Sequence, residues 1–599
     1  MCGITAYCGN GEALPFLIQG LAKLEYRGYD SAGVTVLNNV LTTVKCKGRL
    51  KNLEEKLKDH DMTGHVGIGH TRWATHGIPS NLNSHPHTNP SNTISIVHNG
   101  IIENYRELKD ILLEKGYSFQ SETDSEVVVM CLDYFYEGDL LEAVKKTLNC
   151  IDGSYALCIV STEHPDEVVV AKKASPLVIG RTEDASVAAS DIPALLAYTK
   201  DVYFLDDLEM AVLKKDSITF YNKDGEEITK EMTTIPYDME AAQKNGFDTY
   251  MLKEINEQPH VIQETLRGRI FEHSIVLDEL KDVDFNKFNK VYYVACGTAY
   301  HAGLCGASIL ERATRLPVLT QVASEFRYND PIIDEKTLCI FVSQSGETAD
   351  TLAALKLANE KGCTTIAVTN VLGSTISREA QHTLYTCAGP EIAVASTKAY
   401  TTQLVLLTLI ALYIADKRGD AVDTDLMEQL NNLPEYVSKL IDDEAIFENY
   451  AKALKDKHDC YFIGRSLDYA SVLEGALKLK EVSYVHADAY IAGELKHGPI
   501  ALIEPGTVVI AVATQPHVAA KTISNIQETI ARGAEVILFT VEGQEVSGVE
   551  NIYYLPDINP LLQSVLVAIP LQLIAYHTAC IKGCDVDKPR NLAKSVTVE

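Results

Sequence analysis

The first candidate for chemistry is Cys2, which directly follows the initiator methionine. Removal of Met1 is expected because the next side chain is small, and it would leave a thiol nucleophile and a free α-amino group on one residue. The unperturbed pKa of an α-amino group is about 7.7–8.0, so this group can serve as the base for the thiol. Cys2 alone favours an incidental cysteine behind a retained methionine. The clusters described next reverse this and predict an N-terminal nucleophile.

Four polar clusters that could assist such a nucleophile follow or end short apolar runs. They are residues 26–33 (YRGYDSAG), 70–77 (HTRWATHG), 98–104 (HNGIIEN) and 121–126 (SETDSE). Arg72 could bind a carboxylate bidentately, and Asp124 could pair with an ammonium group. Asn99 and the N–H of Gly100 could hold an oxyanion. These types predict hydrolysis of the side-chain amide of a free amino acid, although each residue alone also fits an ordinary turn or ion pair.

Together with Cys2-Gly3-Ile4, these clusters resemble the class II (N-terminal nucleophile) glutamine amidotransferase family over residues 2 to about 240. The resemblance implies a four-layer αββα sandwich in which the cysteine forms a γ-glutamyl thioester and releases ammonia. It also implies that Asn99 and Gly100 are catalytic. The residues that it places around glutamine are Arg27, Arg72, Trp73, Thr75, His76 and Asp124.

From residue 291 onward, apolar strands alternate with helical segments, which predicts a doubly wound parallel sheet. The pattern occurs twice. Gly297 and Gly464 are 167 positions apart, and Gln344 and Gln515 are 171 apart, each pair at equivalent strand ends. A nearly constant offset indicates a duplicated domain.

Only the first copy has the sequence Ser-Gln-Ser-Gly-Glu-Thr, at residues 343–348. Its three hydroxyls and unpaired N–H groups lie where a strand gives way to a helix, an arrangement that favours phosphate. The Gly-Lys-Ser/Thr of a P-loop is absent, so a nucleoside triphosphate is not expected. A plain helix cap is the alternative, and it accounts for one hydroxyl rather than three.

These features resemble the SIS (sugar isomerase) domain, present twice within residues 249–590. Two such domains behind a class II glutaminase imply conversion of L-glutamine and D-fructose 6-phosphate into D-glucosamine 6-phosphate and L-glutamate. The residues implied to bind the sugar phosphate are Thr298, Ser343, Gln344, Ser345, Thr348, Val394 and Ser396. The chain departs from the family at Ala299, where a serine is common, so a side-chain contact is in doubt there.

Isomerisation requires a ring opener, a proton-transferring base and an electron sink. A predicted helix places Glu474, Lys478 and Glu481 on one face, although alone this pattern fits a surface ion pair. The resemblance implies that Glu481 moves the C1–C2 proton with help from Lys478. It implies that His497, supplied by the neighbouring subunit, opens the ring and that Lys594 forms a Schiff base with the ketone.

Ammonia must reach the sugar before water captures it, and we expect Trp73 and the C-terminal tail to gate a protected passage.

The predicted domains are a glutaminase (2–240), a linker (241–248), two SIS domains (249–425 and 426–589) and a catalytic tail (590–599). The short linker suggests a bacterial-type enzyme. No metal or organic cofactor is required.

Composition excludes several other classes. The net charge of −29 disfavours nucleic acid or an anionic membrane as a partner. The 14 cysteines form no C-x-x-C pair, and no signal peptide is apparent, so a cytoplasmic protein with reduced thiols is expected. The longest apolar run, 404–415, is too short to span a bilayer. We expect the apolar helices at 401–416 and 560–580 to form an oligomer interface, and the family implies a homodimer.

Two rival functions remain. One is an amidotransferase that forms another amino sugar or phosphoribosylamine, which the paired SIS domains and the lack of an acidic diphosphate-binding motif disfavour. The other is a sugar-phosphate sensor with a vestigial glutaminase. The joint presence of Cys2, Glu481, His497 and Lys594 counts against a sensor.

Overall fold

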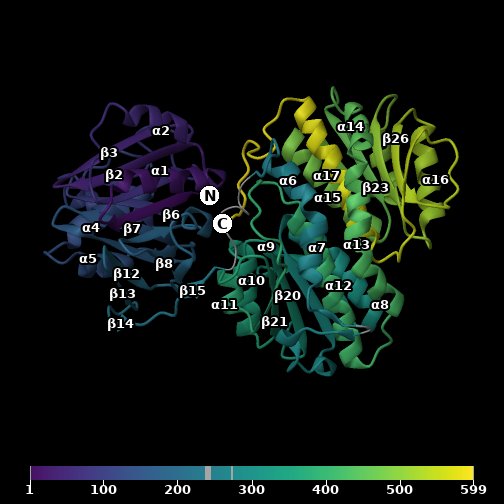
Figure 1. Ribbon diagram of the computed structural model, residues 1–599, viewed down its shortest axis with the longest axis horizontal. Helices are drawn as coiled ribbons and strands as arrows, with labels where there is room; N and C mark the ends of the chain where they lie inside the picture. The colour runs from purple at the N-terminus through teal and green to yellow at the C-terminus, as the bar shows by residue number, and fades with distance from the viewer. Residues whose placement is uncertain (1, 236–243, 272–273, 598–599) are drawn as a thin grey trace. The chain divides into compact units, whose positions relative to one another are not determined.

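The computed structural model describes residues 2–235, 244–271 and 274–597, and its chain divides into two compact units (Figure 1). Unit 1 comprises residues 1–242 with 593–599, and unit 2 comprises residues 243–592. The predicted linker falls at this division, but its residues 241–243 lie outside the described part of the chain.

Unit 1 contains two antiparallel sheets. The first has the order β15-β11-β9-β10-β1-β4-β2-β3. Its strands are β1 (Gly3–Gly9), β2 (Ser31–Asn38), β3 (Val40–Lys47), β4 (Val66–Arg72), β9 (Val178–Arg181), β10 (Ala185–Ala189), β11 (Asp201–Phe204) and β15 (Thr233–Thr234). The predicted nucleophile therefore precedes a strand in the middle of a sheet.

The second sheet has the order β14-β13-β12-β8-β7-β6-β5. Its strands are β5 (His87–Thr88), β6 (Ile94–Ile102), β7 (Gly153–Ser161), β8 (His164–Lys173), β12 (Met210–Lys214), β13 (Ser217–Tyr221) and β14 (Glu227–Ile228). One buried core joins the inward faces of both sheets, with Ile4 and Ile68 from the first meeting Val97 and Cys158 from the second.

Helices cover the outer faces of the two sheets. They are α1 (Ala13–Leu24), α2 (Leu50–Leu57), α3 (Tyr105–Glu114), α4 (Ser125–Phe135) and α5 (Leu140–Leu148). Helix α1 buries a stripe that includes Leu17, Leu21 and Leu24 and contacts β1 and β4, as an amphipathic helix should. Helices α4 and α5 pack on the other sheet. The predicted αββα sandwich is thus confirmed.

Unit 2 contains two five-stranded parallel sheets of the same topology. Their orders are β19-β18-β20-β21-β22 and β24-β23-β25-β26-β27. The strands are β18 (Lys290–Ala295), β19 (Val318–Val322), β20 (Thr337–Ser343), β21 (Thr364–Thr369), β22 (His382–Tyr385), β23 (Asp459–Gly464), β24 (His486–Ile491), β25 (Val508–Ala513), β26 (Glu535–Val541) and β27 (Asn551–Leu555). This identity of order confirms the predicted duplication.

The helices of unit 2 surround and connect these sheets (Figure 1). They are α6 (Tyr250–Asn256), α7 (Gln258–Leu266), α8 (Gly297–Thr314), α9 (Ala323–Phe326), α10 (Ala349–Glu360), α11 (Thr375–Glu379), α12 (Lys398–Arg418), α13 (Thr424–Asp442), α14 (Glu444–Lys452), α15 (Leu467–Ser483), α16 (Ala519–Ile530) and α17 (Gln563–Ile581). A short hairpin, β16 (Ile270–Phe271) with β17 (Ser274–Ile275), lies before the first sheet.

Helices α12 and α17 correct one expectation from the sequence. Both are long and apolar enough to cross a membrane, yet 94% and 83% of their most apolar windows are buried inside the protein. They contribute to one core that includes Ile340 of the first sheet and Ile510 of the second. Their all-round apolar character therefore reflects burial within a single chain, and the expectation that they form an oligomer interface is wrong.

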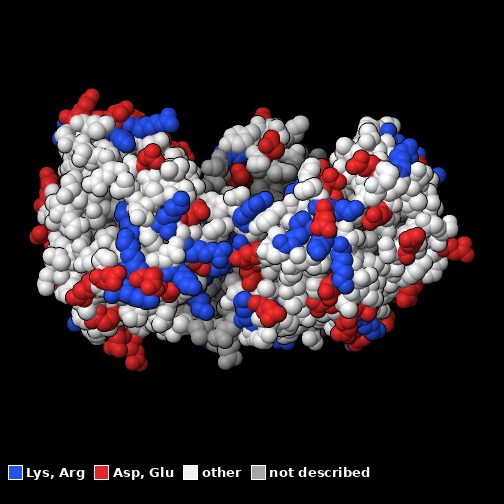
Figure 2. Space-filling model, turned by 90° about the horizontal axis from the view of Figure 1, so that it is seen from above, with Lys and Arg blue, Asp and Glu red and all other residues white. Residues whose placement is uncertain are grey.

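The surface seen in Figure 2 carries Lys and Arg interspersed with Asp and Glu rather than gathered into one basic field. This pattern is typical of a face that does not bind a polyanion along its length. The sugar phosphate that the sequence predicts as a ligand would need a local pocket, and the two strand orders indicate where such a pocket lies. In such sheets ligands bind beyond the carboxyl ends of the strands, between the first and third strands in sequence, here β18 and β20.

Candidate functional site

Cys2 lies immediately before β1 and next to the end of β4. The backbone N–H of Trp73 donates to Cys2 Sγ at 3.3 Å, and the thiol faces the Trp73 carbonyl at 3.5 Å. Burial raises the pKa of the Cys2 thiol. Because the thiol is held largely protonated at neutral pH, formation of the reactive thiolate requires a base close to it.

Two side chains fix the backbone of Cys2. Arg27 Nε donates to the Cys2 carbonyl at 3.3 Å, and Asn99 Nδ2 donates to the same oxygen at 3.0 Å. Arg27 is itself held by an ion pair with Asp191 at 2.7 Å. The structure thus brings together three residues that are far apart in sequence and that the sequence assigned to one site.

His70 sets the orientation of the Asn99 amide. His70 Nε2 lies 3.0 Å from both the His98 carbonyl oxygen and Asn99 Oδ1. A carbonyl can only accept, so His70 Nε2 carries the hydrogen, and the Asn99 oxygen must face His70. The Asn99 NH2 group then points to Cys2. Sequence reasoning missed His70, although its position two residues before Arg72 on a strand gives both side chains the same face.

Gly100 continues β6 with a φ of +132°, a conformation that L-residues rarely adopt. A Cβ at this position would lie 2.0 Å from the backbone oxygen of Ser154. Only glycine therefore fits directly after Asn99, and its backbone can approach a ligand closely.

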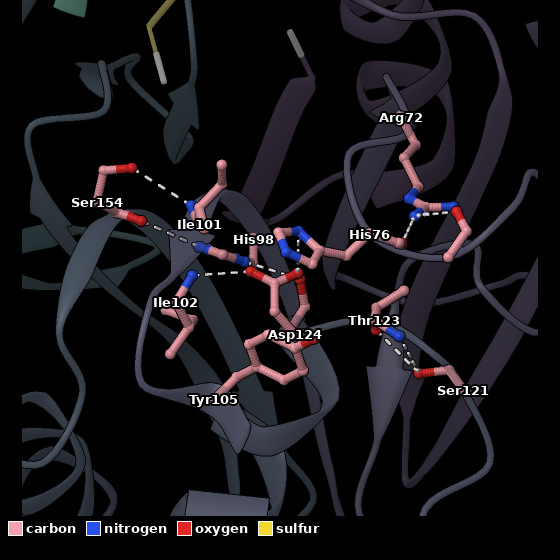
Figure 3. Close-up of polar contacts among 12 residues, drawn as sticks. Arg72, His76, His98, Ile101, Ile102, Tyr105, Ser121, Thr123, Asp124 and Ser154 are labelled. Carbon is pink, nitrogen blue, oxygen red and sulfur yellow. Dashed lines mark hydrogen bonds and ion pairs between the residues drawn. The ribbon is translucent and has the colours of Figure 1, made fainter. Parts of the chain in front are cut away.

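Arg72 and Asp124, both predicted to bind glutamine, lie apart with His76 between them (Figure 3). The Arg72 guanidinium donates to the carbonyl oxygens of His76 and Gly77. Its other terminal nitrogen, NH1, is buried without a hydrogen bond among the described residues. Since a buried, unmatched cationic donor is costly, this nitrogen is available to a substrate carboxylate.

Asp124 is buried just before α4 and accepts a hydrogen bond from the Ile102 N–H at 2.8 Å (Figure 3). Its other oxygen lies 4.0 Å from His76 Nδ1. Thr75, from the same predicted set, is exposed. Trp73 packs edge-on against the Tyr29 ring, with the ring centroids 5.7 Å apart.

Three buried histidine rings, those of His70, His85 and His87, form a contiguous histidine cluster. The centroids of His70 and His85 are 4.1 Å apart, and those of His85 and His87 are 4.6 Å apart. Burial lowers the pKa of His70 to about 3 and lowers the pKa values of His85 and His87 well below the usual value. All three rings are therefore neutral at physiological pH.

This histidine cluster predicts that unit 1 is less stable in acid than at neutral pH. The unfolded histidines bind protons near pH 6.5 while the folded ones do not, so their stabilisation is complete above pH 6.5 and decreases below it. Below pH 6.5, each ring lowers the free energy of unfolding by about 1.4 kcal/mol per pH unit. Fluorescence of Trp73, the only tryptophan of the chain, should report a lower unfolding midpoint at pH 5.5 than at pH 7.5. Equal midpoints would contradict neutral buried rings.

In unit 2, the carboxyl end of β20 forms the predicted phosphate loop, residues 343–348. The Ser343 hydroxyl lies 3.0 Å from the Thr348 hydroxyl and accepts from the Gly346 N–H at 3.0 Å. The Glu347 carboxylate accepts from the backbone N–H and hydroxyl of Thr375, at 2.7 and 2.8 Å. The loop is thus closed on itself and tied to α11.

In the equivalent loop of the second copy, a side chain of the protein fills the position that an anion would take. The buried Asp468 carboxylate accepts from the N–H and hydroxyl of Thr514, at 2.8 and 2.5 Å, and from the Gln515 N–H at 3.3 Å. Burial raises the pKa of Asp468 to about 6. A carboxylate thus takes the donors that an anion would use, which accounts physically for the loss of the hydroxyl-rich sequence in this copy.

The two copies together build one charged cluster. Lys478 Nζ lies 2.5 Å from Glu481 Oε2, 3.4 Å from Glu474 Oε1 and 3.1 Å from the Thr298 hydroxyl. Thr298 belongs to α8 of the first copy, and the other three side chains belong to α15 of the second. The predicted helical face therefore points at the carboxyl end of β18, at the expected position.

Electrostatics fixes the charge of Lys478. Burial lowers its pKa, but the carboxylates of Glu481 and Glu474 outweigh that effect, and the net pKa is raised above its usual value. Lys478 is therefore a permanent cation and not a nucleophilic amine. His301 Nδ1 also contacts Glu474, at 2.7 Å. Sequence reasoning missed His301, one helical turn after Thr298.

The remaining predicted residues are more dispersed. His497 ends a 3-10 turn at Glu494–His497 and is exposed, and no hydrogen bond or ion pair joins it to Lys478 or Glu481 in the described part of the chain. Val394 and Ser396 lie in the loop before α12. Lys594 is half-buried and belongs to the segment grouped with unit 1.

Comparisons with known proteins agree with this division. A glutamine amidotransferase domain model matches residues 70–197, and an SIS domain model matches residues 284–413 and 453–582. The chain is 54% identical over 608 residues to the glutamine–fructose-6-phosphate aminotransferase (isomerizing) of Clostridium tetani, and 45% identical over 605 residues to that of Thermus thermophilus. Both alignments cover all of both proteins.

A solved structure is similar to part of the chain. The C-terminal domain of glucosamine-fructose-6-phosphate aminotransferase from Francisella tularensis is 38% identical, with a TM-score of 0.56. The match covers 58% of this chain and 100% of that structure.

Proposed function

The chain belongs to the glutamine–fructose-6-phosphate aminotransferase (isomerizing) family, and from this membership we propose how its residues divide the reaction. The enzyme converts L-glutamine and D-fructose 6-phosphate into L-glutamate and D-glucosamine 6-phosphate, the first step of amino-sugar synthesis. A sugar-phosphate sensor is not favoured, because the relatives of full length carry the name of the enzyme.

We assign the glutaminase to residues 2–240, the linker to 241–248, the two SIS domains to 249–425 and 426–589, and the catalytic tail to 590–599. The division of the chain at residues 242 and 243 supports the first boundary. The matches of the SIS model, which begin at 284 and 453, support two domains behind it.

In the glutaminase, the α-amino group exposed by removal of Met1 takes the proton of the Cys2 thiol. The Cys2 sulfur then attacks the side-chain amide carbon of glutamine, and the negative charge that develops on oxygen is held by Asn99 Nδ2 and the Gly100 N–H. The protonated α-amino group returns its proton to the leaving nitrogen as this intermediate collapses, which releases ammonia and leaves a thioester that water hydrolyses to glutamate. The unmatched donor of Arg72 and the carboxylate of Asp124 support their assignment to the α-carboxylate and α-ammonium groups.

In the isomerase, Ser343, Gln344, Ser345 and Thr348 hold the phosphate, and Val394 and Ser396 contact the sugar. Lys594 forms an imine with the C2 ketone once His497 has opened the ring, and ammonia displaces Lys594. Glu481 then removes a proton from C1 of the resulting C2 imine and returns it to C2, while the C1 hydroxyl proton passes to the C2 nitrogen, so that the ketose imine becomes the amino aldose. The permanent cation of Lys478 beside Glu481 supports this step, because it stabilises the electron-rich intermediate.

The observation that carries the proposal is the presence of an amide-hydrolysing thiol site and a sugar-phosphate site on one chain. The decisive experiment incubates the purified enzyme with glutamine, with and without fructose 6-phosphate, and measures glutamate and glucosamine 6-phosphate. Equal amounts of both products, dependent on the sugar, are expected. Glutamate without amino sugar would leave only the glutaminase assignment standing.

We further propose a cytoplasmic homodimer in which His497 acts in the partner's site, since its exposure and its lack of a bond to the charged cluster are otherwise unexplained. His497→Ala and Glu481→Gln enzymes should each be inactive. Co-expressed together they should recover about one quarter of wild-type synthesis, because half of the dimers are mixed and each mixed dimer has one intact site. No recovery would place His497 in the site of its own chain.

A further inference from the structure

The loop that contains Val394 and Ser396 has no strand or helix of its own. This sugar loop, residues 390–397, runs between β22 and α12. A segment without regular structure needs other partners for its backbone N–H groups. In this loop the partners include carboxylate and carbonyl oxygens from segments distant in sequence.

The first of these partners is Glu254, on α6. Its Oε1 accepts from the backbone N–H groups of Ile392, at 2.5 Å, and Ala393, at 3.2 Å. The Glu254 side chain is 1% exposed. Hydrogen bonds to a buried carboxylate are shorter and stronger than those between neutral groups, so Glu254 fixes the two residues that directly precede Val394.

The second partner is Asp587, which follows α17. Its backbone oxygen accepts from the Val394 N–H at 3.0 Å. Its carboxylate accepts from the first N–H groups of α6, those of Tyr250 at 3.0 Å and Met251 at 2.9 Å. Asp587 thus holds the sugar loop directly and also holds the helix from which Glu254 reaches it.

The far end of the sugar loop is anchored in a similar way. Glu391 Oε1 accepts from the N–H groups of Thr397 and Ala399, at 2.9 and 3.0 Å. Lys398, the first residue of α12, forms an ion pair at 2.8 Å with Glu257 at the end of α6. Residues on and directly after α6 therefore contact the start of the sugar loop and the first residue of the helix that follows it.

From this arrangement we infer that α6 supports the sugar loop and that Glu254 and Asp587 are positioning residues for fructose 6-phosphate. The inference rests on the proposed function. Neither side chain is assigned a contact with substrate. Glu254 acts through the backbone N–H groups of Ile392 and Ala393, and the Asp587 carboxylate acts through the start of α6. Their loss should therefore weaken sugar binding and leave glutamine hydrolysis unchanged, because the glutamine residues all belong to unit 1.

The test compares Glu254→Ala with Glu254→Gln in the full-length enzyme. The alanine variant should raise the KM for fructose 6-phosphate by about 10- to 100-fold, because displacements of about 1 Å have effects of that size. The KM for glutamine should not change. The glutamine variant keeps an accepting oxygen at the same place, so it should return the KM for the sugar to within about 3-fold of wild type.

Asp423→Ala is the matched control, because Asp423 also accepts from two backbone N–H groups at a helix start, those of Asp425 and Leu426 in α13. It should lower Tm without changing the KM for fructose 6-phosphate. If Glu254→Ala does not fold, Asp587→Ala replaces it, and the same rise in that KM is expected because the N–H groups of Tyr250 and Met251 lose their acceptor. A folded variant with a wild-type KM for the sugar would overturn the inference. A wild-type enzyme that makes no amino sugar would overturn the proposed function instead.

Discussion

Replacement of Cys2 by alanine should abolish release of glutamate and synthesis of glucosamine 6-phosphate, with losses of roughly three orders of magnitude or more. No other described thiol has the same surroundings. Cys2 alone combines a backbone N–H directed at its sulfur with the Asn99 amide directed at its carbonyl oxygen. Product assays for glutamate and glucosamine 6-phosphate measure the effect.

Cys8→Ala provides the matched control for this prediction. Cys8 lies on the strand that Cys2 precedes, its thiol donates to the Asp166 carbonyl at 3.2 Å, and burial raises its pKa to about 12. It is an inert thiol, so both activities should stay within about 2-fold of wild type.

Binding of fructose 6-phosphate to the Cys2→Ala enzyme separates the two half-reactions. Its affinity, measured by titration calorimetry, should equal that of wild type, because the phosphate loop and the charged cluster belong to unit 2. Retention of glutaminase activity in Cys2→Ala would exclude Cys2 as the nucleophile.

The parallel sheets and the duplication of unit 2 were predictable from local pattern, because strand–helix units repeat there with a nearly constant offset. The αββα sandwich of unit 1 was predicted only from the resemblance of its motifs to a known family. The motif residues were also predictable, since polar residues that end strands meet at the edge of a sheet. Cys2 and Asn99 are an example, 97 positions apart and joined by one hydrogen bond.

Other features depend on pairings between distant segments, which local pattern does not encode. The contact of Thr298 with Lys478 crosses from one SIS copy to the other. The burial of α12 and α17 follows from the packing of both copies on one core. The contact of the Asp468 carboxylate with Thr514, in the loop of the second copy that is equivalent to the phosphate loop, likewise depends on the packing of α15 beside β25.

Replacement of Glu481 by glutamine should reduce synthesis of glucosamine 6-phosphate on the order of 10²–10⁴-fold, the usual contribution of a positioned proton-transfer group. An amide keeps the shape of the side chain but cannot accept the C1 proton. The loss should therefore appear in kcat, with little change in the KM for fructose 6-phosphate. Exchange of the C1 hydrogen with deuterated water should slow in parallel, and glutamine hydrolysis should continue.

The same argument applies to Lys478, and it distinguishes a cation from a nucleophile. Lys478→Met removes the charge that lies 2.5 Å from Glu481 and leaves that carboxylate without its closest cation. The electron-rich intermediate then forms without the cation that stabilises it, so synthesis should fall by at least about 100-fold. Lys480→Met, two positions along α15 and largely solvated beside Asp488, should leave synthesis unchanged.

If Lys478 were instead the Schiff-base lysine, borohydride with fructose 6-phosphate would attach the sugar to Lys478. We expect the label on Lys594, because a lysine held cationic by two carboxylates has no free electron pair with which to attack a ketone.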